Sequence, residues 1–235
     1  MIARAFASLL AQEYKPVELL VVDDGSTDGT RDAVASYGHR LQCLYLPNKE
    51  RGVARDACLA ASKGELIVSL DSHDVMLPGL LERLAMALSE EPEIGTADCR
   101  AEFFDEETGS PFDVFPRRPV QGDAILQSAI GNRIAIGSVI ARRSLLDHVG
   151  WFDEDRDLAG VEDWELWTRC LAVGKVPFVD TIGVKIHFPA NNRVGDPQRW
   201  TKRSGEPRAK IIDHPLNQVR LVAHRRKSEQ RCGRG

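Results

Sequence analysis

Short apolar runs that stop at acidic or turn residues alternate with helical patterns along the first 90 residues. The run at 17–22 ends in Asp23-Asp24-Gly25-Ser26, and the run at 66–70 ends in Asp71-Ser72-His73-Asp74. A run of this length bounded by turn residues is typical of a buried strand, and 41–46 is a third. Strands that alternate with helices predict an α/β fold with a parallel sheet, in which ligands bind beyond the carboxyl ends of the strands.

The same periodicities predict the remaining elements. We expect helices over 2–12, 28–37, 52–62, 78–90, 143–148 and 162–172. Further strands are expected over 134–141, 176–180 and 184–188. The segment 104–123 is rich in glycine and proline and is predicted to be a long loop. After Pro189 the pattern fades, which predicts one domain over 1–190 and a partly disordered tail over 191–235.

Composition excludes several classes of protein. A hydrophobic fraction of 43% and a charged fraction of 28% are typical of a globular chain and not of a disordered, collagen-like or disulfide-stapled one. No apolar run approaches the roughly 20 residues that span a bilayer. The five cysteines are scattered, without a CxxC pair, so the pattern favours a reducing compartment over a zinc or disulfide framework.

The net charge of -4 is unevenly distributed. The segment 200–235 carries ten basic and three acidic residues, so the rest of the chain is strongly acidic. A basic stretch such as His224-Arg225-Arg226-Lys227 can contact an anionic membrane surface or a nucleic acid. The simpler interpretation is a solvated tail.

The cluster at 71–74 has the chemistry of a metal site. A strand that delivers carboxylates and an imidazole to a sheet edge can hold Mg²⁺ or Mn²⁺. Such a metal would neutralise a diphosphate leaving group. The alternative is that the acids only cap the next helix, which Asp74 is placed to do before Pro78.

Two other acidic pairs are candidates. Asp23 and Asp24 could accept hydrogen bonds from a base or sugar, or they could only shape a turn. Glu162 and Asp163 open a predicted helix, where the macrodipole favours the carboxylate form. A general base there needs burial or a neighbouring charge to raise its pKa again, and plain N-capping is the alternative.

Two basic residues complete the candidate set. His187 follows an apolar strand, where a histidine is more often structural than a ligand. Arg55, on the 52–62 helix, could pair with a phosphate or with Asp56, or could face solvent.

Taken in order, these motifs resemble family 2 glycosyltransferases with a GT-A fold. The resemblance covers about residues 1–190 and rests on the run 18–28, on Asn48 with Gly52-Val53-Ala54-Arg55, on 64–74, on Gly150-Trp151-Phe152-Asp153 and on 162–167. It implies a Rossmann-like, mostly parallel sheet flanked by helices, and an inverting transfer from a nucleotide-diphosphate sugar, with UDP favoured. The implied acceptor is a glycan or lipid-linked molecule, as in cell-surface polysaccharide synthesis.

The resemblance also implies roles for single residues. Asp23 and Asp24 match the acids that contact the nucleoside, and Arg55 matches a contact to the base or phosphate. Asp71 and His73 occupy the outer positions of the family's Asp-x-Asp metal motif, with Asp74 one place later. Mn²⁺ or Mg²⁺ is the implied cofactor, and His187 resembles a late histidine near the metal. Asp163 matches the general base, with Glu162 beside it.

The sequence departs from the family pattern at two points. A histidine, His73, replaces the second acid of the metal motif. The apolar strand with which family members begin does not precede the helix predicted over 2–12, so we expect an N-terminally truncated GT-A domain. Both departures motivate an alternative, a degenerate GT-A module that binds nucleotide weakly or serves as a partner domain. A sugar nucleotidylyltransferase would need a glycine-rich basic loop that is absent from the start of the sequence. We expect a cytoplasmic protein, peripheral at the inner face of the membrane through its basic tail, and no nucleic-acid partner.

Overall fold

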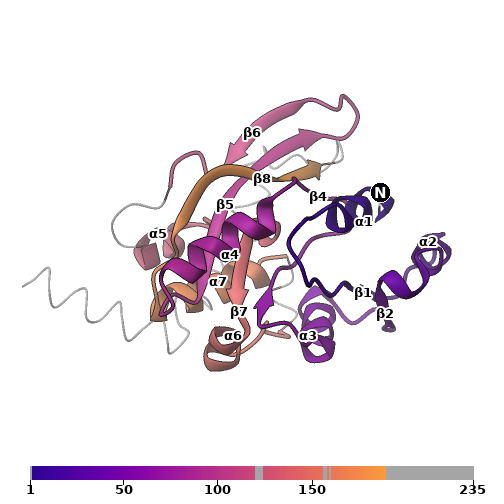
Figure 1. Ribbon diagram of the computed structural model, residues 1–235, viewed down its shortest axis with the longest axis horizontal. Coiled ribbons are helices and arrows are strands. Elements are labelled where there is room, and N and C mark those ends of the chain that lie inside the picture. Colours follow the sequence, from indigo (N-terminus) through magenta and orange to yellow (C-terminus); the bar gives the residue numbers. More distant parts are fainter. Residues whose placement is uncertain (1, 120–123, 156–157, 159, 189–235) are drawn as a thin grey trace, which may run out of the picture.

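The computed structural model describes residues 2–119, 124–155, 158 and 160–188. The described part is an α/β structure in which helices cover both faces of a sheet, with a second, small sheet at one side (Figure 1). The predicted tail over 191–235 lies outside the described residues.

The small sheet belongs to the first 60 residues. Its two strands, β1 (Leu20–Asp23) and β2 (Gln42–Tyr45), pair in parallel. The helices of this region are α1 (Ile2–Leu10), α2 (Thr30–Ala35) and α3 (Arg51–Ala61). The predicted alternation of helix and strand is therefore confirmed, and Asp23 and Asp24 stand at the carboxyl end of β1.

The main sheet has six strands. They are β3 (Leu66–Ile67), β4 (Val75–Met76), β5 (Thr96–Asp105), β6 (Pro111–Phe115), β7 (Val139–Arg142) and β8 (Phe178–Phe188). They run in the order β3-β7-β5-β8-β4, with β6 paired to β5. β5 and β8 are parallel and the other pairs are antiparallel, so the sheet is mixed.

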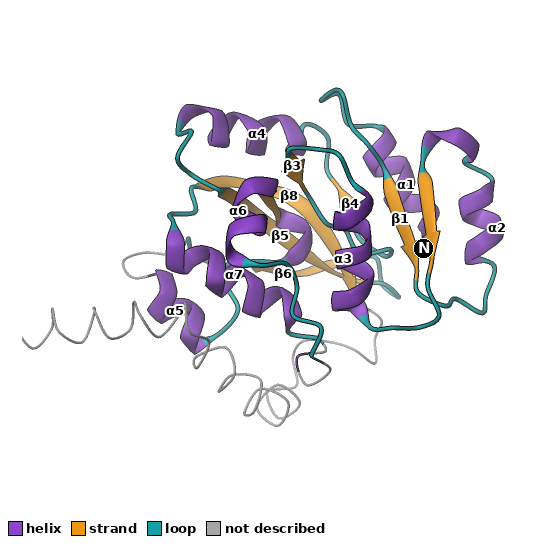
Figure 2. Ribbon diagram, turned by 90° about the horizontal axis from the view of Figure 1, so that it is seen from below, coloured by secondary structure: helices purple, strands orange, loops and turns teal. Residues whose placement is uncertain are grey.

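Helices bury one hydrophobic core on each face of this sheet. The remaining helices are α4 (Leu80–Glu90), α5 (Ala124–Ile130), α6 (Arg143–Val149) and α7 (Glu162–Val173). Leucines of α4 pack with β5 and β8 on one face, and residues of α3, α6 and α7 pack on the other. Figure 2 shows the sheet between α4 and the group formed by α5, α6 and α7.

Several predicted boundaries are wrong. The strand expected over 134–141 begins at Val139, because Ile136–Ser138 form a short 3-10 helix before it. The segment 104–123 is not one loop, because β5 continues to Asp105 and 111–115 forms β6. Proline is tolerated there because β6 is an edge strand, paired only with β5 among the described residues. The strands expected at 176–180 and 184–188 are one strand, β8, and the strand expected over 66–70 ends at Ile67.

β1 and β3 each have a free edge. Within the described ranges, β1 pairs only with β2 and β3 pairs only with β7. Leu20, Val21 and Val22 are consequently half-buried, although an aliphatic run of this kind normally lies inside a sheet.

Gly183 shows how closely β8 is packed. A Cβ atom added there would lie 2.3 Å from Cδ1 of Leu80 and 2.6 Å from Sγ of Cys99, and both side chains are fully buried. We expect Gly183→Ala to lower the free energy of unfolding by about 1–3 kcal/mol, because overpacking forces these side chains to move. Urea unfolding measures this loss as a lower midpoint at an unchanged slope. Gly29→Ala is the control, since nothing lies within 4 Å of its added Cβ; equal stability of the two variants would contradict the packing argument.

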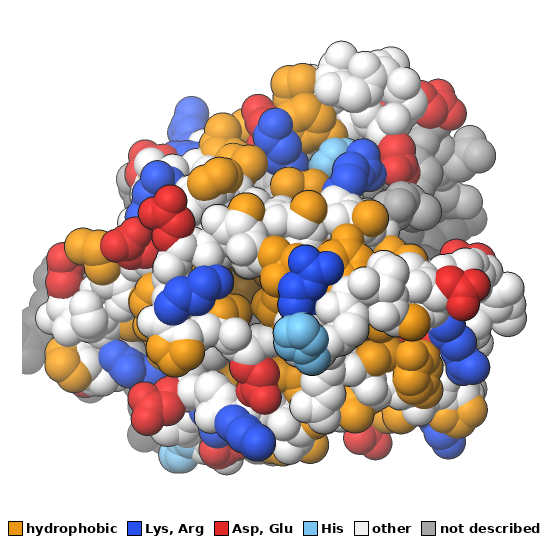
Figure 3. Space-filling view, turned by 45° about the vertical axis from the view of Figure 1, so that its right-hand side comes forward, with side chains coloured by type: hydrophobic (Ala, Val, Ile, Leu, Met, Phe, Trp, Pro, Cys, Tyr) orange, Lys and Arg blue, Asp and Glu red, His pale blue; other side chains and the backbone are white. Residues whose placement is uncertain are grey.

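The described part has a mixed charged surface and short helices. Acidic and basic side chains are interspersed on the face drawn in Figure 3. In the described ranges no helix has the length and apolar character needed to cross a membrane.

Candidate active site

The predicted metal motif forms a compact turn between β3 and β4. One ligand atom from each of Asp71, His73 and Asp74 lies within 4.8 Å of the other two. The backbone N–H of Asp74 donates to the carbonyl of Asp71 at 3.0 Å, which closes the turn, and Nε2 of His73 lies 3.6 Å from Oδ1 of Asp74. Two carboxylates and one imidazole converge, which is a donor set suited to Mn²⁺ or Mg²⁺.

Asp74 and His187 support this interpretation electrostatically. Burial, followed by the nearby charge of Asp71, raises the pKa of Asp74 to about 8. A buried carboxyl of this kind favours a cation beside it. His187 joins the turn through its backbone N–H, which donates to Oδ1 of Asp74 at 3.2 Å. Its imidazole stacks on Phe104 with the ring centroids 5.6 Å apart, and its buried Nδ1 has no hydrogen-bond partner in the described part.

Arg55 connects the metal motif to the start of α7. One guanidinium nitrogen of Arg55 lies 3.0 Å from Oδ1 of Asp71, and the other lies 2.5 Å from Oε1 of Glu162. Burial opposes the charge of Arg55, but the carboxylates of Asp71 and Glu162 outweigh it and raise the pKa of the guanidinium. Glu162 is buried and also accepts the backbone N–H of Gly160 at 2.5 Å. Glu162 is therefore an anchored anion.

Asp163, the next residue, has a raised pKa. Withdrawal from water raises its pKa to about 6, and Glu162 adds to this effect while Arg55 opposes it. Its Oδ1 accepts the backbone N–H of Trp164 at 2.8 Å, and its Oδ2 lies 3.4 Å from the amide nitrogen of Asn132. A carboxylate with a pKa near neutrality can act as a general base at physiological pH.

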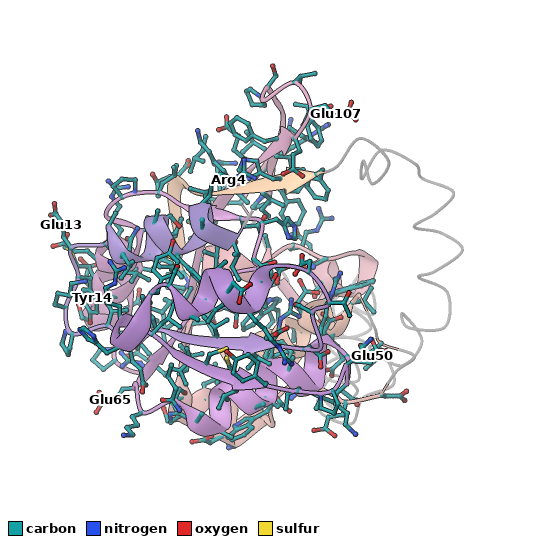
Figure 4. The ribbon with its side chains drawn as sticks, turned by 90° about the vertical axis from the view of Figure 1, so that its right-hand side faces the viewer. Arg4, Glu13, Tyr14, Glu50, Glu65 and Glu107 are labelled. Atoms are coloured by element: carbon teal, nitrogen blue, oxygen red, sulfur yellow. The ribbon has the colours of Figure 1, made fainter. Side chains whose placement is uncertain are left out.

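Asp23 and Asp24 lie at the carboxyl end of β1 and, within the described part, form no hydrogen bond or ion pair with the site residues named above. Asp23 accepts the backbone N–H of Ser26 at 2.8 Å and pairs with Arg31 at 3.2 Å. Asp24 accepts the backbone N–H groups of Lys49 at 2.6 Å and Glu50 at 3.0 Å. Both acids therefore fix the loops at the end of β1. Figure 4 labels Glu50, which marks the loop that leads into α3.

Phe152, from the motif Gly150-Trp151-Phe152-Asp153, supports Arg55. The ring of Phe152 lies 5.4 Å from its guanidinium carbon, and the backbone N–H of Phe152 donates to Asp56 at 3.0 Å. Gly52 permits this contact, because a Cβ there would lie 2.8 Å from the carbonyl oxygen of Asp153. The sequence placed Gly52 and Phe152 in two separate motifs, but it gave no sign that the two motifs pack together.

A second support comes from within α7. Arg169 pairs with Glu165 at 2.6 Å and donates to the carbonyls of Val149, Gly150 and Trp151 at 2.6–2.7 Å. Both charged side chains are almost fully buried. This pair ties the loop that carries Phe152 to the helix that carries Asp163.

The amino-acid sequence of the chain is similar to those of known glycosyltransferases. An uncharacterized glycosyltransferase of Rickettsia typhi is 29% identical over 193 residues, which cover 77% of this chain and 58% of that protein. An uncharacterized glycosyltransferase of Nostoc is 33% identical over 98 residues, or 40% of this chain and 30% of that one. The chain therefore spans less than two thirds of the length of these relatives.

Solved structures share the fold. The crystal structure of TarS from S. aureus superposes with a TM-score of 0.65 at 18% identity, covering 93% of this chain and 38% of TarS. A shorter TarS structure in complex with UDP-GlcNAc gives a TM-score of 0.63 at 18% identity, with 93% and 65% covered. The α/β architecture is thus that of the GT-A fold.

The model of glycosyl transferase family 2 matches residues 1–150. Five ordered motifs, the fold and this match agree, and the chain belongs to glycosyl transferase family 2.

Proposed function

We propose that this domain is an inverting glycosyltransferase that moves a sugar from a UDP-sugar to a hydroxyl group of a glycan or lipid-linked acceptor. One observation carries the proposal. Arg55 joins an Asp/His cluster suited to a divalent metal to the start of α7, where Asp163 has a pKa near 6. A leaving-group site and a base site are thus parts of one connected structure.

UDP-N-acetylglucosamine is the first donor to test. TarS has been crystallised with UDP and with UDP-GlcNAc, and its fold is shared over most of this chain. Asp23 and Asp24, at the end of β1, are the residues we assign to the nucleoside side of the donor. Arg55 has guanidinium N–H groups beyond those bound to Asp71 and Glu162, and we assign these to the phosphate side.

Asp71, His73 and Asp74 are the residues that would hold Mn²⁺ or Mg²⁺, with His187 beside them. The metal, when bound, supplies positive charge to the departing diphosphate. The buried Asp74 carboxyl, to whose Oδ1 the backbone N–H of His187 donates, fits such a cation.

Asp163 then performs the proton transfer. Its carboxylate takes the proton of the acceptor hydroxyl as that oxygen forms a bond to the anomeric carbon of the sugar. The bond from this carbon to the diphosphate oxygen breaks on the opposite face, and UDP leaves with the bonding electrons. Single displacement inverts the anomeric configuration, and the fixed distance between base and leaving group lowers the entropic part of the barrier.

The cellular setting follows from the same proposal. Transfer to a surface-polysaccharide precursor would occur on the cytoplasmic side, where nucleotide sugars are made. The excess of basic residues in 200–235 suits contact with anionic lipids at the inner face of the membrane.

A coupled assay of UDP release tests the metal site. We expect release from UDP-GlcNAc in the presence of Mn²⁺, and its loss when the metal is chelated. His73→Ala should lower the rate by at least about tenfold at subsaturating Mn²⁺, because one metal ligand is removed. Asp28→Asn is the control, since the Asp28 carboxylate accepts the backbone N–H of Thr30 at the start of α2 and is not among the residues assigned to the metal. Equal rates with and without chelator would rule out the metal-dependent mechanism.

The degenerate module remains the second candidate, because β1 and β3 have free edges next to Asp23, Asp24 and Asp71. Calorimetric titration with UDP and Mn²⁺ separates the two. No heat of binding at millimolar UDP would favour the degenerate module over the enzyme.

A further inference from the structure

Asn132 lies in the loop after α5, outside every motif of the sequence. Its side chain forms a hydrogen bond with the side chain of Asp163. Its amide nitrogen is 3.4 Å from Oδ2 of Asp163. Its own Oδ1 accepts the backbone N–H of Ile134 at 3.0 Å, which fixes which end of the amide faces the carboxylate. Because Trp164 holds Oδ1 of Asp163 at 2.8 Å, both oxygens of this carboxylate are held from different directions.

The loop that carries Asn132 is itself anchored to the helix of Asp163. It follows α5, and α5 is tied to α7 by a buried polar contact between Oγ of Ser128 and Oγ1 of Thr168 at 2.6 Å. Thr168 donates its one hydroxyl proton to the carbonyl of Trp164 at 2.8 Å, so Ser128 must be the donor to Thr168. The indole N–H of Trp164 donates in turn to the carbonyl of Ser128 at 2.8 Å.

These contacts have a common result. Trp164, adjacent to the proposed base, is held by α5 through Ser128, and Asn132 at the far end of α5 reaches back to the base itself. The distance between Asn132 and Asp163 is therefore set by buried hydrogen bonds and not by the loop alone.

We propose that Asn132 is a positioning residue that holds Oδ2 of Asp163 toward the acceptor hydroxyl and stabilises the carboxylate form. The inference rests on the proposed function of Asp163 as the base. An amide N–H donor favours the charged carboxylate and opposes the effect of burial. Without it, the base would be more protonated at neutral pH and less well aimed.

Other charges around Asp163 remain in place when Asn132 changes. Arg55 on α3 favours its charged form, and Glu162 on α7 and Asp71 in the β3–β4 turn oppose it. Arg133 is the charged group on the Asn132 loop. A variant at position 132 that leaves these four residues intact thus isolates the contribution of one amide.

The experiment is the pH profile of kcat/KM for UDP-GlcNAc turnover in the wild type, Asn132→Ala and Ser128→Ala. We expect Asn132→Ala to move the acidic midpoint upward by about one pH unit, the size that a hydrogen bond to a charged group implies. We expect kcat to fall about tenfold at a pH above the new midpoint, because the base is no longer aimed. Ser128→Ala removes the hydroxyl bond to Thr168 but keeps both the Asn132 amide and the Ser128 carbonyl that accepts Trp164, so its midpoint should move by clearly less than that of Asn132→Ala.

A second readout does not depend on turnover. The carboxyl ¹³C titration of Asp163, assigned by its loss in Asp163→Asn, should show the same upward shift in Asn132→Ala. An unchanged midpoint in both measurements, or an equal shift in Ser128→Ala, would overturn the positioning role of Asn132. Full activity of Asp163→Asn would instead overturn the base assignment, so the two failures are distinguishable.

Discussion

Asp163→Asn is expected to abolish sugar transfer while the domain still binds UDP with Mn²⁺. An amide cannot take the proton of the acceptor hydroxyl, and general-base catalysis typically contributes a factor of about 10²–10⁴. The substitution changes little else. The side-chain oxygen of Asn can still accept the backbone N–H of Trp164, and Glu162 keeps its bond to Arg55.

Initial rates of UDP release measure the loss of transfer, and calorimetric titration with UDP measures the retained binding. The wild type provides a second check through pH. Because the pKa of Asp163 is raised to about 6, the base is protonated below that pH and ionised above it. The rate should therefore rise about tenfold per pH unit below pH 6 and level off above it. Wild-type rates in Asp163→Asn would show that another group takes the proton.

Arg55→Met is expected to cost both stability and activity. The substitution removes the cation between Asp71 and Glu162, and the Glu162 side chain, which is 4% exposed, loses this cation and keeps the backbone N–H of Gly160. Breaking a buried ion pair in this way typically costs about 3–5 kcal/mol. We expect the lower end of this range, because the Asp71 side chain is 29% exposed and water can solvate it.

Urea unfolding of a double-mutant cycle tests the cause of this loss. Arg55→Met combined with Glu162→Gln should recover part of the stability, since the uncompensated buried charge is gone. Transfer activity should not recover in the double variant, because the link from the metal turn to the start of α7 stays broken. A single variant Arg55→Met as stable as the wild type would contradict the bridging role.

Local patterns explain why much of the fold could be predicted. The strand–helix order of the first half and the helices α6 and α7 follow from periodicity and turn residues, which act over a few positions. β5 was not among the predicted strands, although Ala97, Cys99, Ala101 and Phe103 alternate with Asp98, Arg100 and Glu102 in the period-two pattern of a strand. The pattern does not show how the polar residues of this strand are accommodated. Asp98 is buried, and burial raises its pKa to about 8, whereas Arg100 bonds to Asp180 at 2.6 Å and to the carbonyl of Pro116 at 2.7 Å. These polar residues are acceptable only in the finished sheet.

In the candidate site, too, the sequence predicted some features and the structure alone revealed others. The order of the motifs identified Asp71, His73 and Asp74, and the structure brings their ligand atoms together as expected. For Arg55 the sequence offered a phosphate, Asp56 or solvent as partners. In the structure, Asp56 instead holds the backbone N–H of Phe152, and Arg55 lies on the ring of that residue.

By itself, the sequence determined the α/β class, the motif order and the family, because each depends on residue types at short, regular spacing. Only the tertiary structure decided that Arg55 bridges Asp71 and Glu162, which lie 16 and 107 positions away, and that Asn132 reaches Asp163 across 31 positions. The tertiary structure also determined that, among the described residues, β1 and β3 each pair on one side only. A charged or amide side chain has many possible partners along a chain, and only the packing of distant elements selects one of them.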